Sequence, residues 1–227
     1  IDDDGAFYIG SVLSKNRSIK KLQLRDMRNS REIVTLFMAL QKNKTIEEVS
    51  LRHSIICPWS AKSLNDFIVD NSCLQELRLI DTQIVSTSLQ ILCEGLSQNR
   101  SVKRLYFVNN DVDHTGAPTL RNMLKANKTI KELSICENDL GDEGVVILAE
   151  GLAQNSFVDK LDLRSNDAMV EGALGLQEIL RTSKNLMNLN LASNGLGNVG
   201  AEALVQGLQS ISVLRSLDLS ENGIDSV

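Results

Sequence analysis

Residues 130–157 read IKELSICENDLGDEGVVILAEGLAQNSF, and nearly the whole chain repeats this segment. The segment opens on the frame I-x-x-L-x-I-x-x-N-x-L. Its first three apolar positions recur at Ile19-Leu22-Leu24, Ile46-Val49-Leu51, Leu74-Leu77-Leu79, Val102-Leu105-Phe107, Val158-Leu161-Leu163, Leu186-Leu189-Leu191 and Leu214-Leu217-Leu219. Successive copies are 28 residues apart, except the first two, which are 27 apart. A fixed period of this length predicts a repeat protein in which each repeat contacts its neighbours.

Each repeat predicts one strand followed by one helix. The short L-x-L segment alternates apolar and polar residues, as a strand does when its leucines point inward. Parallel strands need a long crossover, and the second half of the repeat supplies a helix with Leu148 and Leu152 on one face. The same pair recurs at Leu36/Leu40, Leu64/Ile68, Leu92/Leu96, Leu120/Leu124, Leu176/Leu180 and Leu204/Leu208. The sequence therefore predicts an α/β solenoid.

This frame resembles the leucine-rich repeat in its long, ribonuclease-inhibitor-like form, which also builds the repeat domains of NOD-like receptors and the Ran GTPase-activating protein. The resemblance covers the whole chain in eight in-phase copies. It implies a horseshoe with parallel strands on the concave face and helices on the convex face. It also implies that the chain binds other proteins.

Two sets of asparagines recur with the repeat. The resemblance implies a ladder between repeats for the asparagines that follow the strands, which are Asn110, Asn138, Asn166, Asn194 and Asn222. The first three repeats carry Met27, Ser54 and Thr82 there, so we expect them to be less regular. A second set ends the helices, at Asn16, Asn43, Asn71, Asn99, Asn127 and Asn155. We expect these to adopt the left-handed conformation that ends many helices, and their N-x-S/T triplets to be a by-product of capping.

The chain is expected to form a single leucine-rich-repeat domain over residues 1–227, as a piece of a longer repeat chain. Residues 1–16 align without a gap with residues 140–155, so they read as the helix half of a repeat. Residues 220–227 read as the beginning of another repeat.

Composition narrows the classes of function. The net charge is −5 and the pI about 5.2, which argues against general binding of nucleic acid or anionic membranes. The chain has no run of 18 apolar residues and no signal-peptide pattern. Its four cysteines form no C-x-x-C pair, which favours reduced thiols. We therefore expect an intracellular, cytoplasmic protein that is not inserted in a membrane.

The sequence contains few features that indicate catalysis or ligand binding. The two histidines, His53 and His114, lie in different parts of their repeats, and the usual nucleophile, phosphate-loop and metalloprotease motifs are missing. The G-x-G-x-x-G match at 195–200 stands alone in a repeat turn, and the acidic run 2–4 suits a helix start. The sequence predicts no enzyme, and no catalytic residue, cofactor, metal or small-molecule substrate.

The outward positions of the strands are more informative. One column, which follows the third apolar position, reads Arg25, Arg52, Ile80, Val108, Cys136, Arg164, Ala192 and Ser220. Apolar residues with arginines around them are typical of the centre of an interface, although single exposed apolar residues are ordinary. We predict that a protein partner binds the concave face at Ile80, Tyr106, Val108, Cys136, Arg52, Arg78, Arg104 and Arg164.

Other interpretations remain at this point. The next column reads Asp26, His53, Asp81, Asn109, Glu137, Ser165, Ser193 and Glu221, and it suits either a basic partner or a solvated surface. Three functions are open: a non-enzymatic protein-interaction module, a regulator of a small GTPase, and a structural arm packed permanently in a larger assembly.

Overall fold

The computed structural model describes residues 2–209 and 213–225. The chain forms two compact units, Ile1–Asn110 and Asp111–Val227. We call these the N-terminal unit and the C-terminal unit. In both, helices alternate with parallel strands along the chain, so the predicted α/β repeat architecture is confirmed within each of them.

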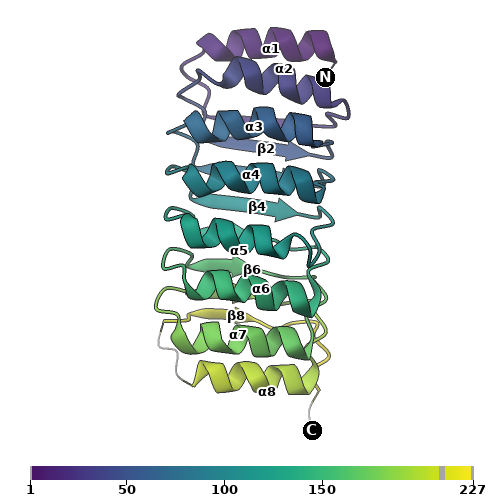
Figure 1. The fold of residues 1–227 in the computed structure, drawn as a ribbon, viewed down its shortest axis with the longest axis vertical. Helices are drawn as coiled ribbons and strands as arrows, with labels where there is room; N and C mark the ends of the chain where they lie inside the picture. The colour runs from purple at the N-terminus through teal and green to yellow at the C-terminus, as the bar shows by residue number, and fades with distance from the viewer. Residues whose placement is uncertain (1, 210–212, 226–227) are drawn as a thin grey trace. The chain divides into compact units, whose positions relative to one another are not determined.

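The N-terminal unit holds four strands that pair in parallel and in chain order. Figure 1 shows its helices side by side in front of these strands, so the helices cover one face and leave the other open. The elements are α1 (Asp3–Lys15), β1 (Lys21–Arg25), α2 (Ser30–Leu40), β2 (Glu48–Arg52), α3 (Pro58–Asp70), β3 (Glu76–Ile80), α4 (Ser86–Gln98) and β4 (Arg104–Val108).

The C-terminal unit repeats this plan with shorter strands. Its elements are α5 (Ala117–Ala126), β5 (Glu132–Ser134), α6 (Gly141–Ala153), β6 (Lys160–Asp162), α7 (Val170–Thr182), β7 (Asn188–Asn190), α8 (Gly197–Leu208) and β8 (Ser216–Asp218). The strands β6, β7 and β8 end at Asp162, Asn190 and Asp218, respectively. The side chain of each of these residues accepts a hydrogen bond from the backbone N–H two residues later, at 3.0–3.1 Å. This local bond competes with strand pairing, and the strands end there.

The strand registers reproduce the repeat spacing. Leu22 pairs with Val49, 27 residues on, and Leu77 pairs with Leu105, 28 residues on. The inward apolar residues and the helix stripe are buried between strands and helices in most repeats, whereas Ile19 at one end and Leu208, Leu214, Leu217 and Leu219 at the other are partly exposed. Burial of such a side chain contributes roughly 1.5–3 kcal/mol, so the apolar frame identified in the sequence accounts for the core.

The predicted asparagine ladder is confirmed. The Asn166 side-chain amide donates to the carbonyl oxygen of Ile135 at 2.9 Å, 31 residues earlier. The bonds from Asn110 to Leu79, Asn194 to Leu163 and Asn222 to Leu191 span the same 31 residues. The residues that replace asparagine in the first three repeats, Met27, Ser54 and Thr82, are also buried. The Met27 backbone N–H donates to the Ser54 hydroxyl, and the Thr82 hydroxyl donates to the Asn110 side-chain oxygen. The strands beside them have five residues against three in the C-terminal unit, so strand length does not show the loss of regularity that we expected.

The helix-ending asparagines do not adopt the conformation expected from the sequence. The φ angles of Asn16, Asn71, Asn99 and Asn127 lie between −63° and −91°, with extended ψ, so the left-handed prediction is wrong. Instead, they form a second ladder on the other side of the core. Asn99 donates to the carbonyl oxygens of Ile68 and Asn71, and accepts from the N–H groups of Ser101 and Val102. Asn43, Asn99 and Asn127 are buried, which supports the view that their N-x-S/T triplets reflect structure.

Left-handed residues occur instead where each strand turns away. Asp26, His53, Asp81, Asn109, Glu137, Ser165, Ser193 and Glu221 all have φ between 48° and 59°. These residues form the column that the sequence analysis interpreted as either a binding surface for a basic partner or a solvated surface. A non-glycine residue in this region carries about 1–2 kcal/mol of strain, and Asp, His and Asn, which occupy the first four of these positions, are the types enriched there. Backbone geometry therefore accounts for the composition of the first half of this column, whereas the last four positions carry Glu or Ser.

A helix position alternates between large and small residues with twice the repeat period. Phe67, Met123 and Ile179 are buried there, and the intervening repeats carry Gly95, Gly151 and Gly207. A Cβ atom on Gly151 would lie 2.9 Å from the Cα of Arg121, and one on Gly207 would lie 2.7 Å from the Gln177 carbonyl oxygen. These glycines let neighbouring helices approach backbone to backbone.

Candidate protein-interaction surface

The open face of the N-terminal unit carries three rows of outward side chains, in register across β1 to β4. The first row is Lys21, Glu48, Glu76 and Arg104, the second is Gln23, Ser50, Arg78 and Tyr106, and the third is Arg25, Arg52, Ile80 and Val108. Neighbouring strands lie about 4.8 Å apart, so the residues of a row contact one another directly. Six of the eight predicted site residues fall on this surface.

A network around Glu76 holds three of those residues in place. Glu76 is only 5% exposed, and it forms ion pairs with both Arg78 and Arg104. The Arg78 guanidinium lies over the Tyr106 ring, 3.9 Å from its centroid, a cation–π contact. Two arginines and a tyrosine are therefore positioned before any partner binds, which lowers the entropic cost of binding.

The charge of Glu76 is favoured by this arrangement. Burial raises the pKa of the Glu76 carboxyl, but the hydrogen bonds from Arg78 and Arg104 outweigh burial and hold the pKa below its ordinary value. A carboxyl with a lowered pKa stabilises the fold above the pKa of the unfolded state, and this contribution is lost as the pH falls through the folded pKa. The network is thus intact at neutral pH and opens only in acid.

The third row combines apolar and cationic side chains. Ile80 and Val108 are direct neighbours and half-buried. Arg25 and Arg52 are also direct neighbours, and both are exposed. Neither guanidinium forms an ion pair with a residue of the described chain. The Arg25 Nη2 atom lies 3.4 Å from the Nε2 atom of His53. Two like charges directly opposite each other on adjacent strands destabilise the sheet.

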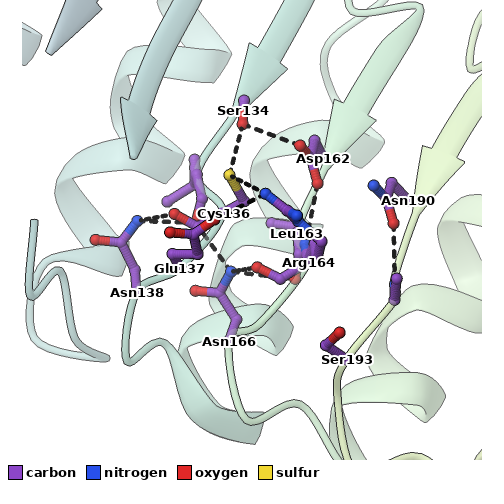
Figure 2. A network of polar contacts seen from close by, with 12 residues as sticks. Ser134, Cys136, Glu137, Asn138, Asp162, Leu163, Arg164, Asn166, Asn190 and Ser193 are labelled. Atoms are coloured by element: carbon purple, nitrogen blue, oxygen red, sulfur yellow. Dashed lines mark hydrogen bonds and ion pairs between the residues drawn. The ribbon is translucent and has the colours of Figure 1, made fainter. Parts of the chain in front are cut away.

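Cys136 and Arg164, the remaining predicted site residues, belong to the C-terminal unit. The expectation that Cys136 is solvent-facing is wrong, because it is 3% exposed. Figure 2 shows the reason: the Arg164 guanidinium lies over the thiol, with Nη2 3.7 Å from Sγ, and the Ser134 hydroxyl approaches Sγ at 3.4 Å. Arg164 is itself paired with Glu137 through Nη2 at 2.8 Å, whereas its buried Nε atom has no hydrogen-bond partner among the described residues.

A shallow hollow borders the third row at the end of the strands. Its volume is about 430 Å³, and it is lined by Asp26, Arg28, His53, Ser54, Ile55, Asp81 and Gln83. His53 Nδ1 is hydrogen-bonded to the Asp81 carboxylate. Because a carboxylate only accepts, Nδ1 carries the proton in the neutral ring, and Nε2 accepts from Arg25. The hollow thus orients one of the exposed arginines.

The two units differ in charge, which the net value conceals. The N-terminal unit has 15 Lys and Arg against 12 Asp and Glu, and the C-terminal unit has 9 against 17. The open face of the N-terminal unit lies on the basic part of the chain. The net charge of −5 therefore does not argue against an anionic partner for this surface. A count of charged residues in each half of the sequence would have revealed the difference between the two units.

Other kinds of site find no support in the described residues. No group of three His, Cys, Asp or Glu side chains among them is arranged to hold a metal ion. No helix in the described part of the chain is both long enough and apolar enough to cross a membrane. The cysteines form no disulfide.

Cys57 is expected to be a more reactive thiol than Cys93 and Cys136. Burial raises its pKa, but hydrogen bonds from the Ser30 side chain and from Ser60 and Trp59 at the start of α3 lower it to about 7. Burial raises the pKa of Cys93 and of Cys136. Because the thiolate is the nucleophile, alkylation of Cys57 should reach half its maximal rate near pH 7, which peptide mass spectrometry after brief iodoacetamide treatment measures.

A Ser30→Ala variant provides the control for this prediction. It removes one of the hydrogen bonds that lower the pKa of Cys57, so the half-maximal rate should move to higher pH. Faster labelling of Cys93 or Cys136 than of Cys57 would contradict the assignment.

A family model described as "Leucine Rich repeat" matches residues 126–149, 182–205 and 210–227. Among solved structures, the chain is similar to one named "Leiomodin-1 Actin-Binding Site 2 (ABS2)", with 23% identity, a TM-score of 0.46, and coverage of 56% of this chain and 75% of that one. No curated protein matches. The matched segments are leucine-rich repeats and follow the strand–helix period of the fold, and they cover less than half of the chain.

Proposed function

We propose that this chain is a non-enzymatic protein-interaction module of the ribonuclease-inhibitor-like form, and that it binds a protein partner on the open face of its N-terminal unit. The observation that carries the proposal is the preorganised group of Tyr106, Arg78 and Arg104 around the buried Glu76 carboxylate. Tyrosine and arginine are the side chains most enriched at the energetic centres of interfaces. Ile80 and Val108 add apolar surface beside them.

The proposal is tested by affinity capture with the intact chain and a Tyr106→Ala/Val108→Glu double variant. The substitution removes the aromatic ring and places a charge on the apolar pair, so a partner held by the parent chain should bind at least tenfold more weakly to the variant. Circular dichroism and thermal unfolding establish that the variant folds.

Val205→Glu is the matched control, because Val205 is an exposed valine on α8, on the helix side of the C-terminal unit. This variant should retain the partner. Equal capture by the parent and the double variant would refute the proposed surface, and loss of the partner in the Val205→Glu variant as well would show that charge alone explains the effect.

A further inference from the structure

The third row on the open face of the N-terminal unit combines two features that a partner must match. Along the row, Arg25 and Arg52 come first and Ile80 and Val108 follow, each residue in register with the next. The arginines are exposed, and neither forms an ion pair with a described residue. The two acidic residues of the open face, Glu48 and Glu76, are engaged with Lys21, Arg78 and Arg104.

This distribution leaves a local excess of positive charge beside an apolar pair. Two arginine side chains that start about 5 Å apart on adjacent strands repel each other, and a carboxylate between their guanidinium groups would relieve that repulsion through charge-assisted hydrogen bonds. The half-buried apolar pair beside them favours an aliphatic or aromatic side chain, which would bury its remaining exposed surface. The complementary ligand therefore carries an acidic group and an apolar group.

From these contacts we infer that the open face binds an extended acidic segment of a protein, with a carboxylate on Arg25 and Arg52 and a large apolar side chain on Ile80 and Val108. The centres of the two pairs are two strand spacings apart, about 10 Å. In a polyproline II segment, which has three residues per turn and advances about 3.1 Å per residue, side chains three positions apart lie on the same side and about 9 Å apart. The acidic and apolar residues of the ligand are therefore three positions apart. This inference rests on the proposed function and specifies its partner.

A protein ligand explains this surface better than a nucleic acid does. Asp26 and Asp81 line the hollow beside the arginines, so the positive charge is local and suits a single carboxylate better than a continuous phosphate backbone. Ile80 and Val108 offer no hydrogen-bonding group to a base edge or a phosphate. Tyr106, the aromatic ring on this face, is already covered on one side by Arg78.

The test is selection of a random twelve-residue peptide library displayed on phage, with the intact chain as bait. Enriched peptides should contain Asp or Glu three positions from a large apolar residue. Synthetic peptides made from them should bind at least tenfold more weakly to an Arg25→Glu/Arg52→Glu variant, and more weakly as the salt concentration rises. A Lys15→Glu/Lys42→Glu variant is the matched control, because it changes the charge equally at exposed positions away from the strands.

The outcomes separate this inference from the proposed function. Peptides that lose binding to the Tyr106→Ala/Val108→Glu variant, but lack acidic residues or still bind the Arg25→Glu/Arg52→Glu variant, would overturn the inference and leave the proposed function standing. A selection that yields no peptide dependent on Tyr106 and Val108 would count against both. Binding of fluorescein-labelled oligothymidylate or oligouridylate that requires Arg25 and Arg52, without selection of acidic peptides, would replace the protein ligand with a nucleic acid.

Discussion

An Asn194→Ala variant is expected to lose about 3–5 kcal/mol of the free energy of unfolding. The Asn194 side chain is a rung of the ladder that follows the strands. Its amide nitrogen donates to the carbonyl oxygens of Leu163, Leu191 and Ala192, at 2.9–3.2 Å. Its amide oxygen accepts from the backbone N–H groups of Asn166 and Ala168, both at 3.0 Å. Alanine removes all five and leaves two buried backbone N–H groups without an acceptor, at about 1–3 kcal/mol each.

Urea unfolding followed by circular dichroism measures this loss as a lower midpoint at an unchanged dependence on urea. Asn122→Ala is the matched control, because Asn122 is exposed on α5 and alanine favours helix. It should leave the midpoint unchanged or raise it slightly. Similar midpoints for both variants would mean that the ladder contributes little to stability.

A Phe67→Ala variant is expected to cost about 3–5 kcal/mol, as is usual for a buried aromatic residue. Phe67 is fully buried on α3, and its ring meets that of Phe37 edge to face, with centroids 5.4 Å apart. Phe67 occupies a helix position that carries glycine in alternate repeats, where neighbouring helices approach too closely for a side chain. Removal of the Phe67 ring would leave a cavity beside Phe37.

The same unfolding measurement tests this prediction, with Phe7→Ala as its matched control. Phe7 is 60% exposed on α1, so its removal should change the free energy of unfolding by less than about 0.5 kcal/mol. A loss below about 1 kcal/mol for Phe67→Ala would show that the alternation of large and small residues does not shape the packing.

The regular part of this fold could be predicted from sequence because the same pattern of apolar residues occurs eight times along the chain. The positions of Leu77 and Leu105 in one frame predicted that they pair across strands, and they do. The ladder through Asn166 and Asn194 followed from the same reasoning. In such positions the local pattern and the tertiary contact have the same period, so the pattern is sufficient.

The prediction failed where side chains reach across repeats. Cys136 occupies an outward position, but the guanidinium of Arg164, 28 residues later, folds over it. The helix-ending asparagines satisfy carbonyl groups of the preceding repeat, so a rule based on helix ends alone assigned the wrong conformation to Asn99. The contacts of Gly151 with the backbone of Arg121 likewise depend on how closely α5 and α6 pack. These outcomes depend on distances between repeats, which residue types do not encode.

The candidate surface was predicted in part. Ile80, Val108, Tyr106 and three arginines lie together on one open face, as expected from their columns. The burial of Glu76 and its two ion pairs were missed, because a glutamate at an outward strand position gives no sign that it is covered. Arg25 was in the column but was not selected, although its pairing with Arg52 is the clearest sign of an anionic partner.

Site-specific photocrosslinking from the open face tests the central claim most directly. A benzophenone amino acid at position 80 places the probe beside Val108, and the same probe at position 38 lies on α2, where Met38 is 60% exposed on the helix side of the same unit. With the captured partner present, we predict a covalent adduct from position 80 and none from position 38. An adduct from position 38 alone would place the partner on the helices and contradict the account.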